Sequence, residues 1–126
     1  MRTLQNDFTT TEQSKRLLEL GVPEWTANWK LSKLVKDSHG QKPKDKHDWV
    51  VNRKDYTHMI VGFMKYDYLP CWSVGRLIEI YNMCVDFDLD DGAAIVIFIQ
   101  DESPIVQMMQ MFEDKVGIMD FSKLED

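Results

Sequence analysis

The stretch Leu69-Pro70-Cys71-Trp72-Ser73 decides the fold, because it marks the place where a buried helix begins. Ser73 is a favourable N-cap residue, since its hydroxyl can accept a hydrogen bond from a free N–H of the first turn. Trp72, just before the cap, can pack against Leu77 as a hydrophobic staple. Helical spacing then continues through an apolar set: Val74, Leu77, Ile78 and Tyr81. The pattern predicts a helix starting at Ser73.

Two further helices are predicted on either side of this one. Thr9-Thr10-Thr11-Glu12 resembles a capping box in which Glu12 reaches back to the cap, and Gly21 is a natural helix end because glycine adopts the left-handed conformation without penalty. Near the C-terminus, Ser103 is a cap and Pro104 fits the first helical position. The apolar stripe of that helix is Ile105, Met108, Met109, Phe112 and Val116.

The remaining apolar segments are interpreted as strands, with one exception. Residues 49–51 and 56–64 are rich in β-branched and aromatic residues, and residues 52–55 between them can turn a hairpin. Residues 93–99 are apolar throughout, which is typical of a central strand covered on both faces. The exception is 23–35, where tryptophans spaced four apart favour a helix.

Strand–helix–strand–helix is therefore the expected order from residue 56 to residue 116. If the two strands are parallel neighbours, a right-handed crossover through the helix that starts at Ser73 joins them. The predicted fold class is α+β: a small mixed sheet of about three strands packed by two to four helices. With 126 residues and 44% hydrophobic composition, the chain fits a single domain over 1–126.

Charge is distributed unevenly along the chain. Between Lys30 and Lys54 there are eight Lys or Arg against three Asp, whereas from Glu79 to Asp126 there are twelve Asp or Glu against two Lys. Residues 36–48 contain almost no apolar side chain, and Gly40 and Pro43 interrupt them, which predicts a flexible basic loop. The net charge of −6 argues against nucleic acid as the main partner.

Two cysteines without a signal-like N-terminus point to a reducing, cytoplasmic location, and no apolar stretch approaches the length that spans a membrane.

Alternate carboxylates at 86–91 suggest a calcium loop, but the register fails: Gly92 falls one place late, and Ile97 stands where a bidentate Glu is needed. A weaker cation site there is left open. The histidines at 39, 47 and 58 lack zinc-ligand spacing, so neither metal nor cofactor is expected.

Two alternatives to a plain structural role arise from the residues. Cys71 lies close to a helix N-terminus, which can lower the pKa of a thiol, although no histidine base is near in sequence. The basic segment 25–54 combines lysines with flanking tryptophans, the combination by which proteins hold single-stranded nucleic acid. The candidate residues for nucleic-acid or partner binding are Trp25, Trp29, Lys30, Lys33, Lys36, Lys42, Lys44 and Lys46.

Two segments, Thr9 to Pro23 and Leu69 to Ile80, resemble small uncharacterised proteins of gut Bacteroidetes and their phages or integrated elements. The shared features are a Thr-Thr-x-Glu-Gln-Ser start and a Pro-x-Trp-Ser helix opening. These proteins have no established activity, so the resemblance implies a lineage and a fold but no catalytic residue.

The sequence leads to three functional hypotheses. The first is a non-catalytic accessory or adaptor protein of a phage or mobile element that acts through protein–protein contacts. The alternatives are single-stranded nucleic-acid binding through 25–54 and a small thiol-dependent enzyme using Cys71. The identity of the partner and the oligomeric state stay open at this stage.

Overall fold

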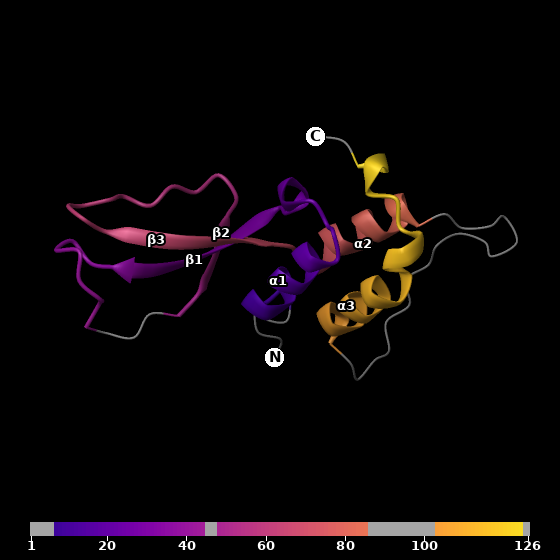
Figure 1. Ribbon diagram of the computed structural model, residues 1–126, viewed down its shortest axis with the longest axis horizontal. Helices are drawn as coiled ribbons and strands as arrows, with labels where there is room; N and C mark the ends of the chain where they lie inside the picture. Colours follow the sequence, from indigo (N-terminus) through magenta and orange to yellow (C-terminus); the bar gives the residue numbers. More distant parts are fainter. Residues whose placement is uncertain (1–6, 45–47, 86–102, 125–126) are drawn as a thin grey trace, which may run out of the picture.

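The computed structural model describes residues 7–44, 48–85 and 103–124, in which three strands form one sheet beside three α-helices. The predicted α+β class and the three-stranded sheet are confirmed. Figure 1 shows an elongated molecule, with the sheet at one end and the helices gathered at the other. We call residues 27–71, which contain the sheet, the sheet lobe.

Helix α1 (Thr11–Glu19) begins at the predicted capping box, with one difference in its members. Thr10 Oγ1 accepts a hydrogen bond from the Gln13 N–H (3.2 Å), and Gln13 Oε1 accepts one from the Thr10 N–H (2.9 Å). Gln13 therefore closes the box instead of Glu12, because the box is counted from Thr10. Gly21, with φ +98°, follows the helix as predicted.

The helix predicted over 23–35 is wrong. Only a short 3₁₀ turn, η2 (Glu24–Thr26), forms there, and it is followed by strand β1 (Trp29–Lys36). β1 is the central strand: Leu31 pairs with Val51 on one side and with Leu69 on the other. Pairing with two neighbours outweighs the four-residue spacing of the tryptophans, because strand position depends on contacts distant in sequence.

The sheet has the order β2-β1-β3, and both pairs are antiparallel. β2 (Val50–Arg53) agrees closely with the strand predicted at 49–51, but β3 (Lys65–Cys71) follows the segment 56–64 instead of including it. The predicted hairpin between 49–51 and 56–64 is therefore wrong. The expected central strand at 93–99, and with it any parallel pairing of that strand, lies outside the described residues.

The two later helices are confirmed. α2 (Val74–Cys84) starts after Ser73, whose Oγ accepts a hydrogen bond from the Arg76 N–H (3.2 Å). α3 (Pro104–Lys115) has its proline in the first turn, as predicted. Two short 3₁₀ turns, η4 (Val116–Ile118) and η5 (Phe121–Lys123), follow α3.

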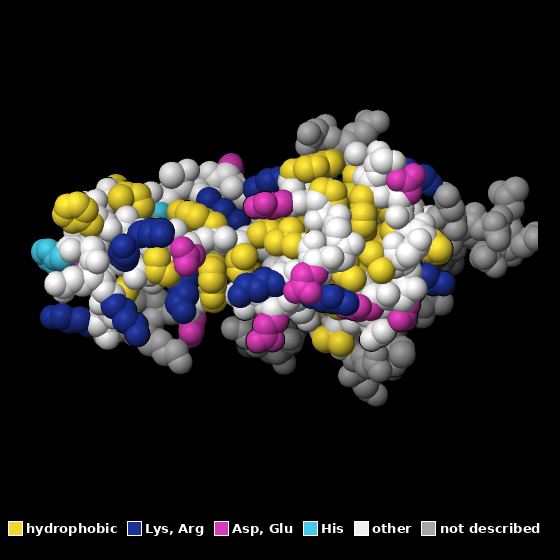
Figure 2. Space-filling model, in the orientation of Figure 1, with side chains coloured by type: hydrophobic (Ala, Val, Ile, Leu, Met, Phe, Trp, Pro, Cys, Tyr) yellow, Lys and Arg dark blue, Asp and Glu magenta, His cyan; other side chains and the backbone are white. Residues whose placement is uncertain are grey.

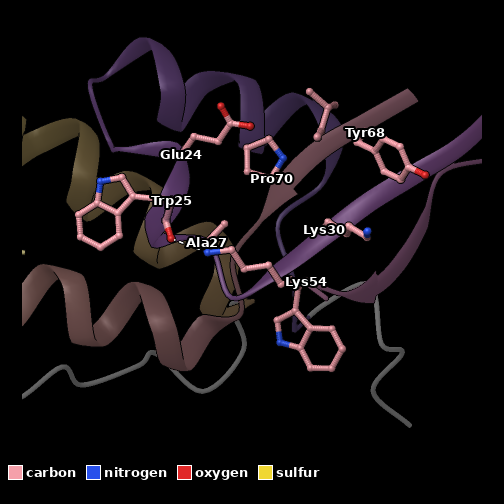
Figure 3. Close-up of a pocket in the computed structure, with 9 residues that line it drawn as sticks. Glu24, Trp25, Ala27, Lys30, Lys54, Tyr68 and Pro70 are labelled. Atoms are coloured by element: carbon pink, nitrogen blue, oxygen red, sulfur yellow. Dashed lines mark hydrogen bonds between the residues drawn. The ribbon is translucent and has the colours of Figure 1, made fainter. Parts of the chain in front are cut away.

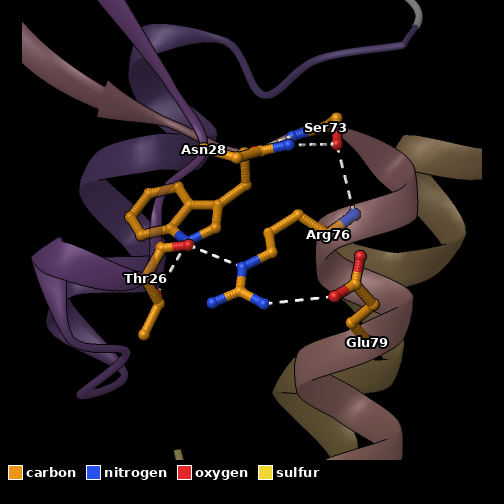
Figure 4. A network of polar contacts seen from close by, with 6 residues as sticks. Thr26, Asn28, Ser73, Arg76 and Glu79 are labelled. Carbon is orange, nitrogen blue, oxygen red and sulfur yellow. Dashed lines mark hydrogen bonds and ion pairs between the residues drawn. The ribbon is translucent and has the colours of Figure 1, made fainter. Parts of the chain in front are cut away.

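The main buried core of the described residues lies among the helices and the 3₁₀ turns that follow α1 and α3. Its fully buried members include Leu17, Trp72, Leu77, Ile80, Met108 and Phe112. Polar contacts join this core to the start of the sheet (Figure 4): Arg76 Nε donates to the Thr26 carbonyl (2.8 Å), and Asn28 Nδ2 donates to Ser73 Oγ (2.9 Å). The sequence Trp72-Ser73 is thus the junction between the sheet lobe and the helices.

Candidate functional site

The strand register divides the exposed sheet into two chemically different faces. Residues directly opposite each other in an antiparallel pair lie on the same face. One face, here called the basic face, carries Trp29, Leu31, Lys33, Lys36, Arg53, Lys65, Asp67 and Leu69. The other, called the tyrosine face, carries Lys30, Ser32, Leu34, Asn52, Tyr66, Tyr68 and Pro70.

Part of the segment 56–64 packs on the tyrosine face and contacts its aromatic rings. His58 stacks on Tyr66, with ring centroids 3.9 Å apart, and Tyr56 meets His58 edge-on at 4.8 Å. Lys30 Nζ lies 4.8 Å from the centroid of Tyr68 and also donates to the Tyr56 carbonyl. These rings therefore stabilise the lobe, and their faces are already in contact with other side chains of the chain.

An open pocket of about 530 Å³ lies where the sheet meets η2. Figure 3 shows Trp25 and Tyr68 toward its two ends, with Lys54 and Lys30 between them. Lys54 Nζ donates to the Trp25 carbonyl (2.6 Å), so this ammonium group is held by the protein itself. Glu24 also lines the pocket, and its carboxylate opposes the binding of an anion there.

The structure brings only some of the predicted binding residues together. Trp25, Trp29 and Lys30 line the same pocket, but Trp29 is half-buried and packs edge-on against Phe8 (5.1 Å). Lys33 and Lys36 lie on the basic face, whereas the exposed lysines 42 and 44 belong to the connection toward β2. Lys46 is outside the described residues. The eight candidates therefore do not form one site.

The segment between β2 and β3 exposes a group of large apolar side chains at the far end of the sheet lobe. Met59 is 82% exposed and Phe63 74%, while Ile60 and Val61 are each more than half exposed. We call these four residues the apolar tip. Figure 2 shows hydrophobic and basic side chains together at this end of the molecule. Exposed apolar side chains that are contiguous, in contrast to isolated ones, typically mark an interaction surface.

A tight turn at 37–41 supports the apolar tip from beneath. The Phe63 N–H donates to the Ser38 carbonyl (2.9 Å), and Gly62 is held against the same oxygen with φ +61°. Within the turn, a backbone N–H of Gln41 donates to the carboxylate of Asp37 and lowers its pKa. The tip is thus presented on a hydrogen-bonded support.

Charge is distributed unevenly along the sequence. Residues 27–71 contain nine Lys or Arg and five Asp, whereas residues 72–126 contain three Lys or Arg and twelve Asp or Glu. In Figure 2, Lys and Arg side chains predominate over the sheet, whereas basic and acidic side chains are interspersed over the helices. The apolar tip therefore lies in the basic half, and an acidic surface would approach it with a favourable long-range field.

Cys71 does not have the surroundings of a nucleophile. It is the last residue of β3, is fully buried, and exchanges weak hydrogen bonds with Thr9. Burial raises the pKa of its thiol to about 11, which is opposite to the shift that creates a reactive thiolate. Cys84 is equally buried, and burial raises the pKa of its thiol as well.

We therefore expect both cysteines of the native protein to react with a thiol reagent at pH 8 about 100-fold or more slowly than free cysteine. Below its raised pKa, each thiol stays protonated, and burial also excludes the reagent. Ellman's reagent with and without denaturant measures this. Rapid labelling of Cys71 alone in the native protein would contradict the assignment of Cys71 as a buried, unreactive thiol. It would instead support the hypothesis of a thiol-dependent enzyme.

In residues 7–44, 48–85 and 103–124, no group of three potential metal-ligating side chains comes together, and the acidic segment 86–91 lies outside these ranges. None of the helices in the described part of the chain has the length and apolar character needed to cross a membrane.

Comparison of the chain with protein-family models, curated proteins and solved structures finds no match.

Proposed function

We propose that the chain is a non-catalytic protein-binding module whose contact surface is the apolar tip of the sheet lobe. The observation that carries the proposal is the exposure of Met59, Ile60, Val61 and Phe63 together on a hydrogen-bonded support. Apolar anchors surrounded by charged groups are the usual composition of a protein interface. The resemblance to phage and mobile-element proteins supports a role as an accessory protein of such an element.

The test uses a tip variant, Met59→Ser/Val61→Ser/Phe63→Ser, as bait in a nuclease-treated extract of the native host. The matched control, Met83→Ser/Val106→Ser/Ile118→Ser, removes similarly exposed apolar side chains from the helical side. We expect proteins recovered by wild type and control to fall by about tenfold or more with the tip variant. Equal recovery by all three baits would contradict the proposal.

Single-stranded nucleic-acid binding is the second candidate, because the sheet lobe carries an excess of basic residues. Stacking of bases requires free aromatic faces. His58 stacks on the ring of Tyr66, the ammonium group of Lys30 lies over the ring of Tyr68, and Trp29 packs edge-on against Phe8. Of the two candidate tryptophans, Trp25, 37% exposed, is the more accessible. The geometry thus favours the protein partner.

Tryptophan fluorescence distinguishes the two functions. We expect a single-stranded oligonucleotide to cause no salt-sensitive quenching, because the net charge is −6 and few ring faces are free. The titration is carried out at low and at moderate salt with the wild type and with Trp25→Phe. Quenching that is strong at low salt, weak at moderate salt and lost in Trp25→Phe would instead establish the nucleic-acid function.

A further inference from the structure

The outer edge of β3 presents backbone groups for pairing with another strand. β3 is an edge strand, so alternate residues point their N–H and C=O groups away from β1. Three observations show that the even-numbered residues do so. The N–H of Phe63, an odd-numbered residue, donates to the Ser38 carbonyl on the β1 side. The carbonyl of Trp72, an even-numbered residue, accepts from the Thr9 N–H on the opposite side. Pro70 is also even-numbered, so its lack of an N–H costs no hydrogen bond to β1.

The same edge already binds a strand at one end. The Thr9 N–H donates to the Trp72 carbonyl (2.9 Å), and the Val74 N–H donates to the Asp7 carbonyl (2.9 Å), with Phe8 and Ser73 forming an antiparallel bridge. Between the start of β3 and Pro70, the backbone N–H and C=O groups that point away from β1 are those of Tyr66 and Tyr68. Among the described residues, neither tyrosine makes a backbone hydrogen bond outside its strand.

The sequence Met64-Lys65-Tyr66-Asp67-Tyr68, which covers the first residues of β3 and the residue before them, is complementary to itself when two copies run antiparallel about Tyr66. In this register Lys65 of each copy lies opposite Asp67 of the other. Met64, which directly precedes β3, meets Tyr68. Opposite charges and apolar side chains that face each other across two strands stabilise the pair.

Neighbouring registers lack this complementarity. Centring the pair on Lys65 places two ammonium groups opposite each other, and centring it on Asp67 places two carboxylates opposite each other. Centring it on Tyr68 brings Pro70 opposite Tyr66, where the proline cannot donate. Tyr66 is therefore the centre at which charge and hydrogen bonding are both satisfied.

We propose that a second copy of this chain binds the outer edge of β3, with the two β3 strands antiparallel and Tyr66 on the two-fold axis. The inference goes beyond the proposed function, because it assigns the outer edge of β3, and not the apolar tip, to a second copy of this chain. Tyr66 of each copy exchanges backbone hydrogen bonds with Tyr66 of the other, and Tyr68 donates to Met64.

Charge reversal tests this register by sedimentation velocity at sub-millimolar protein concentrations. Lys65 and Asp67 are both exposed, so their variants are expected to fold, which circular dichroism checks. We expect Lys65→Asp and Asp67→Lys each to weaken dimerisation about tenfold, because two opposite-charge pairs become like-charge pairs. Both the double variant and an equimolar mixture of the two single variants should regain the wild-type dimer.

A disulfide cross-link reports the axis directly. Tyr66→Cys is expected to form a covalent dimer under mild oxidation, because residues on the axis face each other within disulfide range, while the exposed control Val50→Cys on β2 stays monomeric. A wild type that is monomeric throughout, or a dimer unaffected by charge reversal, would overturn the second-copy assignment. If the wild type is monomeric but the tip variant still recovers fewer host proteins than the wild type, only the second-copy assignment fails and the proposed function stands.

Discussion

Replacing Trp72 with alanine is expected to lower the free energy of unfolding by about 3–5 kcal/mol. The indole is fully buried between the sheet and the helices, and its Nε1–H donates to Thr26 Oγ1 (3.0 Å). Truncation leaves a large cavity and removes one of the two hydrogen bonds of the buried Thr26 hydroxyl, which keeps its bond to the Pro23 carbonyl. The cavity therefore accounts for most of the expected loss. Urea denaturation followed by circular dichroism measures the change.

Trp25→Ala is the matched control for this prediction. Trp25 is partly exposed at the edge of an open pocket, so its truncation should change the free energy of unfolding by about 0.5 kcal/mol or less. Losses of similar size in the two variants would show that Trp72 is not the central packing residue of the junction.

The second large effect is expected at Gly62, which supports the apolar tip. Its φ of +61° is unfavourable for other residues, and a β-carbon there would overlap the Ser38 carbonyl oxygen, which is backbone. Gly62→Ala should therefore cost about 1–3 kcal/mol and displace the tip from the 37–41 turn. The change is measured by urea denaturation, and NMR shifts of Ser38 and Phe63 report the displacement.

Gly117→Ala provides the comparison, because a β-carbon at Gly117 meets no atom within 4 Å and its φ is not positive. This variant should leave the free energy of unfolding nearly unchanged. If Gly62→Ala were as stable as Gly117→Ala, the tip would not be held by the contact with Ser38.

The helices could be predicted because the signals that start and end them are local. The hydroxyls of Thr10 and Ser73 cap α1 and α2, and Pro104 opens α3, so a few adjacent residues are sufficient to locate each helix. The position of β1 could not be predicted in this way. Its assignment depends on Leu31 pairing with Val51 and Leu69, and those partners are separated from it by 20 and 38 positions in the sequence.

The candidate surface was only partly visible in the sequence. The concentration of positive charge in the sheet lobe follows from the residues, and Trp25 and Lys30 do line one pocket. The apolar tip was missed because Tyr56 to Met64 has the composition of a buried strand, and composition does not distinguish a buried from an exposed apolar segment. Gly62 was the available signal, since glycine inside a strand pattern indicates an irregular backbone.

The central claim is that the apolar tip is a surface for protein contacts, and site-specific photocross-linking tests it most directly. A photoreactive amino acid is placed at Val61, or at the equally exposed Val106 on α3 as the control, in the full chain expressed in its native host. We expect a discrete cross-linked protein species from position 61 and none from position 106. Equal cross-linking at both positions, or none at position 61, would contradict it.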